Sequence, residues 1–258
     1  MDTDPILQLY LAVWLAVLGA ALGSFLNCAA DRGGLPTGRS RCDHCGHVLT
    51  ARDLVPVVSY LRCRGRCRYC KERISARCLV FELAGAVLFA ALGLHFGLQL
   101  ELVMQLIFGS LLLLLSLIDW RTHTLPDQLL LAAALNRLLF VFLLRQPLGA
   151  TLAHMALGAF SVSLPLLVLS LVMDHLLQKD TLGGGDIKLL FVLGLYLNWL
   201  EMILLLFVGC VLALVWALGP GKKRPHAAIA LGPFLSAAWL LVTLFGTPWV
   251  QWYLALLG

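Results

Sequence analysis

The sequence predicts an all-α membrane protein that crosses the bilayer about eight times. Hydrophobic residues make up 60% of its 258 residues, and charged residues only 13%. Residues 146–173 contain no Asp, Glu, Lys or Arg over 28 positions. That run exceeds the roughly 20 apolar residues that cross a hydrocarbon core as a helix. Composition and run length together indicate a polytopic helical protein.

The first expected helix covers residues 6–30. Its apolar run is too long for the apolar part of a cleaved signal peptide, and acidic rather than basic residues precede it. We therefore interpret it as a permanent membrane helix. Pro248, after Thr247, leaves open whether the last helix ends early. The other seven expected helices span residues 79–99, 102–118, 128–145, 147–173, 187–200, 202–219 and 227–257.

Lysine and arginine residues predict the orientation, because short basic loops stay in the cytoplasm. Of the 19 in the chain, eleven lie in 31–78, three in 222–224, and one each at Arg121, Lys179 and Lys188. With eight crossings all of these fall on one face, so both termini are expected to face away from the cytoplasm. The net charge of +5 then reflects topology and contact with anionic headgroups, and gives no support for nucleic-acid binding.

Residues 31–78 are polar and basic, and are expected to form a small cytoplasmic domain between the first two helices. A segment this short lacks the apolar periodicity to build a core alone, so it needs a metal or disulfides. Its two C-x2-C pairs are separated by 21 residues, close to zinc-ribbon spacing. The reducing cytoplasm disfavours disulfides. The sequence therefore predicts a structural Zn²⁺ held by four thiolates, those of Cys42, Cys45, Cys67 and Cys70.

Two other interpretations of the cysteines stay open. His44, His47 and Cys63 are spare ligands, so registers with one of them in place of a cysteine also fit. Unmetallated thiols are the other alternative, and they would leave the segment without a core. The remaining cysteines lie in or beside helices, where we expect small buried hydrophobic side chains. These are Cys28, Cys78 and Cys210.

Two aspartates are expected near the cytoplasmic boundary of the membrane. Asp186 precedes Glu201 by 15 residues, which is about 22 Å of helix, whereas the hydrocarbon core is about 30 Å thick. From Glu101 to Asp119 the helical rise is about 27 Å. Two carboxylates at similar depth suggest an aspartyl dyad. One would act as general base towards a water and the other as general acid towards a carbonyl.

Gly183 and Gly185 precede Asp186 and permit positive φ, which would let a substrate backbone approach closely. From the residues alone, two other interpretations of the acids stay open, one purely structural and one functional. Asp119 and Asp186 merely end and cap their helices in contact with water, or they mark the ion or proton pathway of a membrane transporter.

Five blocks of the sequence resemble, in order, those of the type IV prepilin peptidases. These are GxGD-type intramembrane aspartyl proteases of bacterial pilus, type II secretion and competence systems. The blocks cover most of the chain, and the cysteine segment is the longest and most specific. They are "GSFLN" at 23–27, "CDHCGHVLTARDLVPVVSYLRCRGRCRYCKERIS" at 42–75, "IDWRTHTLPD" at 118–127, "GGGDIKLL" at 183–190 and "LGPFL" at 231–235.

The resemblance implies that Asp119 and Asp186 are the catalytic pair. It implies cleavage of prepilin and pseudopilin leaders after glycine, at the cytoplasmic face of the bacterial inner membrane. Many members also methylate the new N-terminal amine with S-adenosylmethionine. Three parts are implied: residues 1–30 as the first helix, 31–78 as the zinc-binding domain and 79–258 as the peptidase domain.

Further candidate residues surround the predicted dyad. Asp127 matches the family pattern and suits a capping or supporting role. Glu82 is a candidate for binding the methyl donor or the amine, with a satisfied buried acid as the alternative. Arg137 departs from the usual apolar residue or glycine. Either its helix is short and Arg137 snorkels, or it faces a wet cavity and pairs with an acid. The candidates for contact with substrate are Gly183, Gly185, Pro233 as a groove-lining kink, Lys188 and Asp127.

Overall fold

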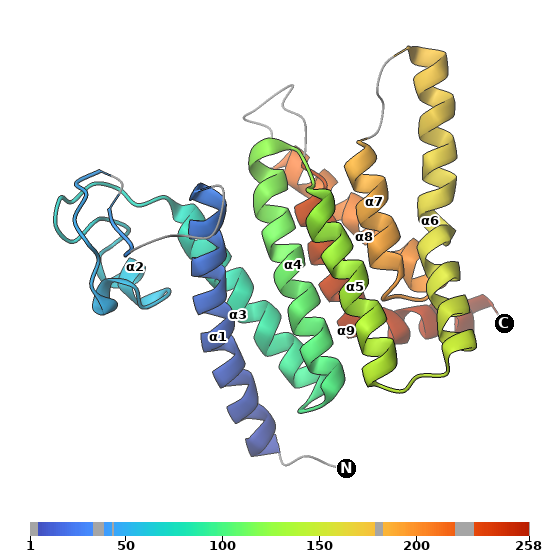
Figure 1. The fold of residues 1–258 in the computed structure, drawn as a ribbon, viewed down its shortest axis with the longest axis horizontal. Helices are drawn as coiled ribbons and strands as arrows, with labels where there is room; N and C mark the ends of the chain where they lie inside the picture. The colour runs from blue at the N-terminus through green and yellow to red at the C-terminus, as the bar shows by residue number, and fades with distance from the viewer. Residues whose placement is uncertain (1–4, 33–38, 43, 179–182, 220–229, 258) are drawn as a thin grey trace. The chain divides into compact units, whose positions relative to one another are not determined.

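The computed structural model describes residues 5–32, 39–42, 44–178, 183–219 and 230–257, drawn as a coloured ribbon in Figure 1. Over these residues the regular secondary structure is helical, with two isolated β-bridges in the cysteine segment. The all-α prediction is confirmed. The chain forms two compact units, residues 1–102 and 103–258. Lys179 and residues 222–224, which contribute to the predicted orientation, lie outside the described residues.

The first unit is built on α1 (Pro5–Arg32) and α3 (Ala76–Phe96), which pack along each other (Figure 1). Gly19 lies against the backbone carbonyl of Gly85, and Gly23 lies against that of Phe81. As the residue number along α1 rises, the number of the residue that it contacts on α3 falls, so the two helices are antiparallel. Small residues let membrane helices approach this closely, and a Cβ at either position would overlap the facing carbonyl.

The second unit contains most of α4 (Leu100–Thr122) and five later helices. Among them α7 is central, because it contacts α5, α6, α8 and α9. Its Leu189 and Leu193 are fully buried. The five helices are α5 (Asp127–Leu143), α6 (Leu148–Leu177), α7 (Gly184–Gly194), α8 (Trp199–Leu218) and α9 (Gly232–Leu257).

Six of the described helices are long and apolar enough to cross a membrane: α1, α3, α4, α6, α8 and α9. Each of the eight predicted apolar runs contains a helix in the described residues, but the prediction of eight crossings is not confirmed. α5 has 17 residues and α7 only 11. At 1.5 Å per residue α7 is about 16 Å long, roughly half the hydrocarbon thickness. The predicted 187–200 helix was wrong in its end, since a turn at 195–198 separates α7 from α8.

The last helix, α9, continues through Thr247 and Pro248 to Leu257, so an early end at these residues is wrong. Membrane helices tolerate an interior proline when neighbouring groups satisfy the freed backbone. Pro233 was expected to kink a helix interior, but α9 begins at Gly232. A proline in the first helical turn removes no intrahelical hydrogen bond, because the N–H groups there have no helical partner.

Candidate active site and metal centre

The four predicted cysteine ligands lie together in the first unit. The Sγ atoms of Cys42, Cys45, Cys67 and Cys70 are all within 4.8 Å of one another, and those of Cys42 and Cys70 are 3.9 Å apart. A tetrahedral zinc site with bonds of about 2.3 Å places its sulfurs about 3.8 Å apart. The donor set and its spacing therefore fit zinc, without room for a substrate ligand among the four thiolates.

Two similar turns carry these cysteines. In the first, the Cys42 N–H donates to the His47 carbonyl and the Gly46 N–H to the Cys42 carbonyl, both at 2.9 Å. In the second, the Cys67 N–H donates to the Glu72 carbonyl at 2.7 Å and the Lys71 N–H to the Cys67 carbonyl at 3.0 Å. Gly46 has φ 68°, as its place in a tight turn predicts. Lys71 occupies the equivalent place with φ 63°.

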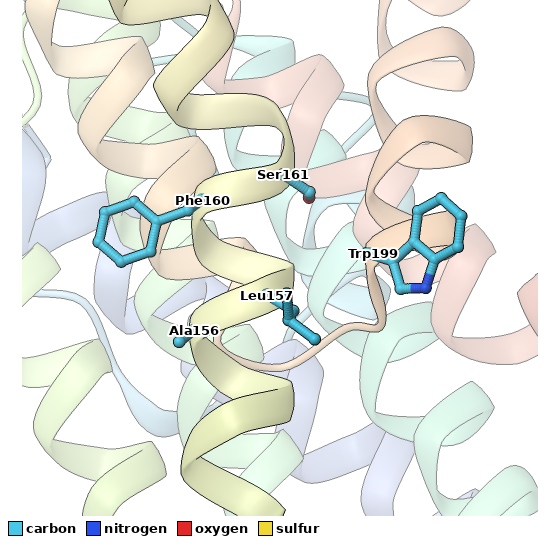
Figure 2. A pocket seen from close by; sticks show the side chains of 5 residues that line it. All are labelled: Ala156, Leu157, Phe160, Ser161 and Trp199. Carbon is cyan, nitrogen blue, oxygen red and sulfur yellow. The ribbon is translucent and has the colours of Figure 1, made fainter.

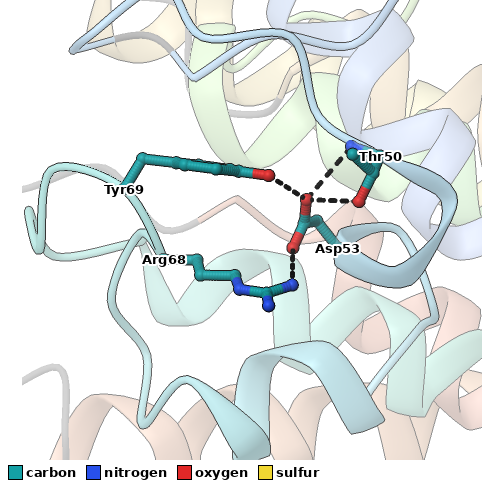
Figure 3. Close-up of polar contacts among 4 residues, drawn as sticks. All are labelled: Thr50, Asp53, Arg68 and Tyr69. Carbon is teal, nitrogen blue, oxygen red and sulfur yellow. Dashed lines mark hydrogen bonds and ion pairs between the residues drawn. The ribbon is translucent and has the colours of Figure 1, made fainter.

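Asp53 joins the turns of this segment, a role that the sequence did not reveal (Figure 3). One of its oxygens accepts hydrogen bonds from the Thr50 hydroxyl at 2.7 Å, the Thr50 N–H at 3.1 Å and the Tyr69 hydroxyl at 3.1 Å. The other lies 3.7 Å from Arg68 Nη1. The hydrogen bonds from Thr50 lower the pKa of this carboxyl most. Asp53 thus ties the residues before α2 (Val58–Arg62) to the second cysteine turn.

The spare ligands do not enter the described cluster, which consists of the four cysteines alone. The His47 ring instead stacks on Tyr69, with ring centroids 3.7 Å apart. The expectation that the other cysteines are buried was wrong. The Cys78 Sγ accepts a hydrogen bond of 3.3 Å from Asn27 Nδ2, so this thiol lies against a polar partner on α1 rather than in an apolar core. Cys28 and Cys78 are half-buried and Cys210 is exposed.

Glu82 is a buried acid at the centre of the first unit. One carboxylate oxygen accepts a hydrogen bond from the Ser24 hydroxyl at 2.7 Å, and the other accepts one from the Val57 N–H at 2.7 Å. The side chain is 7% exposed. Glu82 thereby links α3 to α1 and to the segment that leads into α2.

Asp119 lies near the end of α4 and is 5% exposed. Its Oδ2 accepts a hydrogen bond of 2.9 Å from the Gly232 N–H, at the first residue of α9. The N-terminal end of a helix stabilises a negative charge through such free N–H groups. A Cβ at Gly232 would come within 2.8 Å of the same oxygen, so the contact requires glycine.

Asp186 lies in the first turn of α7, outside the six candidate spanning helices. Burial raises the pKa of its carboxyl to about 6, and the negative charge of Asp119 raises this pKa as well. The two carboxyls, 67 positions apart in the sequence, therefore lie within electrostatic range of each other. A carboxyl with a raised pKa keeps a proton closer to neutral pH, which is what a general acid needs.

The glycines before Asp186 do not have the backbone conformation that we predicted. Gly183 caps α7 with φ −64°, and neither it nor Gly185 is among the glycines with positive φ. Close packing restricts these positions instead. A Cβ at Gly183 would lie 3.2 Å from Asp186 Oδ2, and one at Gly185 would lie 3.3 Å from the Cβ of Leu125.

An ion pair connects the start of α5 to the start of α7. Lys188 Nζ lies 2.7 Å from Asp127 Oδ1, and both side chains are exposed. Asp127 is the first residue of α5, in keeping with the supporting role expected for it. Together with the Leu125 contact at Gly185, the pair clamps the loop after Asp119 onto the turn that carries Asp186.

Arg137 faces a cavity rather than snorkelling to an interface. Its Nε donates a hydrogen bond of 3.1 Å to the carbonyl of Leu195, the residue that caps the C-terminal end of α7. Its Nη1 lies 3.7 Å from the sulfur of Met104. Positive charge is favourable at the C-terminal end of a helix, so Arg137 helps α7 to end inside the protein.

Two family models match the chain. Residues 17–96 match the bacterial peptidase A24 N-terminal domain. Residues 106–218 match the type IV leader peptidase family, and this range includes Asp119, Asp127 and Asp186. No solved structure matches the chain.

Several curated proteins named prepilin leader peptidase/N-methyltransferase are similar over most of the chain. One from Burkholderia pseudomallei (strain 1026b) is 36% identical over 91% of this chain and 77% of its own length. One from Myxococcus xanthus is 36% identical over 83% of this chain and 66% of its own length. One from Bacillus subtilis is 31% identical over 93% of this chain and 96% of its own length. With relatives of this similarity along nearly its whole length, the chain belongs to the type IV leader peptidase family.

Proposed function

We propose that the protein is an intramembrane aspartic endopeptidase that removes the leader of type IV prepilins and pseudopilins after a glycine. The observation that carries this is the pairing of Asp119 with Asp186, two carboxyls brought within electrostatic range from helices α4 and α7. Relatives named prepilin leader peptidase support the substrate class. We place the protein in the bacterial inner membrane, with the dyad and the zinc-ribbon segment on the cytoplasmic side.

One contact distinguishes the two carboxyls. Asp119 is the more buried of the two, but it accepts a hydrogen bond from the Gly232 N–H, which stabilises its negative charge, and that negative charge in turn favours a proton on Asp186. Asp119 is then the general base, which takes a proton from water as the water attacks the carbonyl carbon of the scissile peptide. Asp186 is the general acid, which donates its proton to the carbonyl oxygen and so neutralises the charge that develops there.

The shape of a prepilin agrees with this location. Its basic leader stays on the cytoplasmic side while its apolar helix stays in lipid, so the junction between them reaches carboxyls at the membrane boundary. Gly183 and Gly185 closely precede Asp186 in the sequence, and Pro233 follows Gly232, whose N–H contacts Asp119. All three remain our candidates for lining the path of the substrate. Lys188 and Asp127 bind each other and act on substrate through the position of α7.

N-methylation of the new amine by S-adenosylmethionine is suggested by the names of the relatives. Glu82 does not fit as a ligand of that cofactor in this structure, because both its carboxylate oxygens already accept hydrogen bonds and the side chain is buried. We therefore derive no methyl-transfer step from it. Zinc fits the four cysteines and has a structural role, holding the segment that connects α1 to α3.

The direct test is a cleavage assay with the purified full-length protein in detergent. A prepilin with a glycine–phenylalanine junction should be cut after the glycine, and the product mass identifies the bond. Addition of S-adenosylmethionine should add about 14 Da, the mass of one methylene, to the mature fragment if methyl transfer occurs. A folded protein that cuts none of several prepilins would return us to the transporter interpretation, which ion flux in liposomes tests.

The Lys188–Asp127 pair gives a second test of the site. Asp127→Lys and Lys188→Asp should each lower kcat about three- to tenfold, because an exposed pair contributes about 1 kcal/mol at most and its like-charge replacement displaces α7. The double swap restores opposite charges and should recover most of kcat, with KM little changed in all three. A double variant as slow as the slower single variant would show that the pair does not position Asp186.

A further inference from the structure

A second polar site lies at the other end of α7 from Asp186. It is a cavity of about 310 Å³ at the C-terminal end of α7, between the α5–α6 turn and the start of α8. The 11 residues of α7 separate it from the dyad, which is about 16 Å along the helix. Its polar lining residues are Arg137, Gln146, Thr151, His154, Tyr196 and Asn198.

The charge of this cavity favours an anion. Arg137 and His154 line it, and its lining contains no carboxylate. The residues that precede α6 and α8, Pro147 and Asn198, also line it, so the cavity lies at the N-terminal ends of two helices, of which that of α8 is closed by a capping box. The nearest acid in sequence, Glu201, is engaged in capping, since it accepts hydrogen bonds from the Asn198 N–H and the Thr247 hydroxyl, each at 3.1 Å.

A second pocket is apolar, with a volume of about 410 Å³, and Figure 2 shows the side chains that line it. It is lined by Ala156, Leu157, Phe160, Ser161 and Trp199. The two pockets are lined by consecutive residues on α6 and at the start of α8: Met155 and Asn198 line the cavity, and Ala156 and Trp199 line the apolar groove.

On α6 the lining residues continue along one helical face. His154, Leu157 and Ser161 follow each other at spacings of three and four residues, the spacing that keeps helical side chains on one side. Figure 2 shows Leu157 and Ser161 pointing from α6 towards the side of Trp199. Leu157 is 60% exposed and Trp199 is 51% exposed. Tryptophan favours the membrane–water interface, so we expect these exposed side chains to meet lipid where headgroups and acyl chains join.

We propose that an anionic phospholipid occupies this cavity and groove, with its phosphate beside Arg137 and His154 and one acyl chain along Leu157. The cationic donors of the cavity match the phosphate of such a lipid, and the apolar groove matches its acyl chain.

The test uses the full-length protein, stripped of lipid in detergent, and measures the rise of the unfolding midpoint with added ligand. The probes are phosphatidylglycerol, diacylglycerol with the same acyl chains, and glycerol 3-phosphate. We expect phosphatidylglycerol to bind at least tenfold more tightly than either of the others. Arg137→Gln should weaken its binding about tenfold. Arg145→Gln is the matched control, because it removes the same charge from the nearby α5–α6 turn outside the cavity, and it should bind like the wild type.

Two exposed positions keep the test decisive if Arg137→Gln fails to fold. His154→Gln should weaken binding of phosphatidylglycerol, and Leu157→Trp should do so by filling the groove. Equal binding of diacylglycerol, or full stabilisation by glycerol 3-phosphate alone, would overturn the proposal. So would unchanged binding in both His154→Gln and Leu157→Trp. Displacement of the lipid by a prepilin, with KM raised in Leu157→Trp, would assign the groove to the substrate and overturn it as well. Prepilin cleavage is a separate readout, so its failure would not affect these results.

Discussion

Asp119→Asn and Asp186→Asn should each reduce prepilin cleavage by a factor on the order of 10²–10⁴ or abolish it. Asparagine keeps the size of the side chain and can still accept the Gly232 hydrogen bond at position 119. It cannot take a proton from water as a carboxylate does, nor donate an acidic proton as a carboxyl does. The measurement is kcat/KM for a prepilin with the purified variants. The double variant should be no slower than the slower single one, because the two carboxyls act as a unit.

Asp174→Asn is the matched control for these variants. Asp174 lies on α6, where its carboxylate accepts a hydrogen bond of 3.3 Å from Ser170. The same chemical change there should leave cleavage within about twofold of wild type, in line with the small effects of substitutions outside a site. Unfolding midpoints establish that all three variants fold. Full cleavage by either Asp119→Asn or Asp186→Asn would refute the assignment of the dyad.

Cys67→Ser should release the metal and unfold the segment between α1 and α3. Cys67 is the most buried of the four cysteines, at 4% exposed, and its backbone forms the second turn. Structural zinc contributes an apparent free energy of about 10–16 kcal/mol in small zinc-binding peptides at neutral pH, which such a segment cannot replace from an apolar core. We expect bound zinc to fall from about one ion per chain to a small fraction of it. Trypsin should then cut rapidly at the arginines of residues 52–73.

Cys63→Ser separates a ligand effect from the loss of any thiol in this segment. Cys63 is half-buried and lies outside the four-sulfur cluster, so this variant should keep its zinc and its resistance to trypsin. Treatment of the wild type with a strong chelator should reproduce the trypsin pattern of Cys67→Ser. Equal zinc content in the Cys63 and Cys67 variants would contradict the four-cysteine ligand set.

The cysteine cluster could be predicted from the sequence because each pair of ligands is local. Two C-x2-C turns fix four sulfur positions with little help from the rest of the chain, and Gly46 signals the first turn directly. The helices could be predicted because apolar runs of this length have few alternatives. Hydropathy did not predict the end of α7, because the turn that follows Gly194 is itself mostly apolar, and the group that satisfies the Leu195 carbonyl there is Arg137, from another helix.

The glycines near the dyad show a second limit of sequence reasoning. A glycine pattern does not distinguish positive φ from close packing, and here packing against Asp186 and Leu125 is what Gly183 and Gly185 require. The contact of Gly232 with Asp119 joins residues 113 positions apart. It involves a main-chain N–H, so no side-chain property of the sequence signals it. Pro233 lies next to this contact, in the first turn of α9, and does not kink a helix interior as we predicted.

The Gly232 contact also affects how mutational scans of this protein are interpreted. A scan exchanges side chains, whereas the group that faces Asp119 is an amide that every variant except proline retains. In such a scan, position 232 will appear to tolerate only a small side chain. Its inactive variants will therefore be interpreted as packing defects. Replacement of the amide by an ester keeps the shape of the backbone and removes only the donor. Volume and hydrogen bonding at this position thus belong to different atoms, and only chemistry on the main chain separates them.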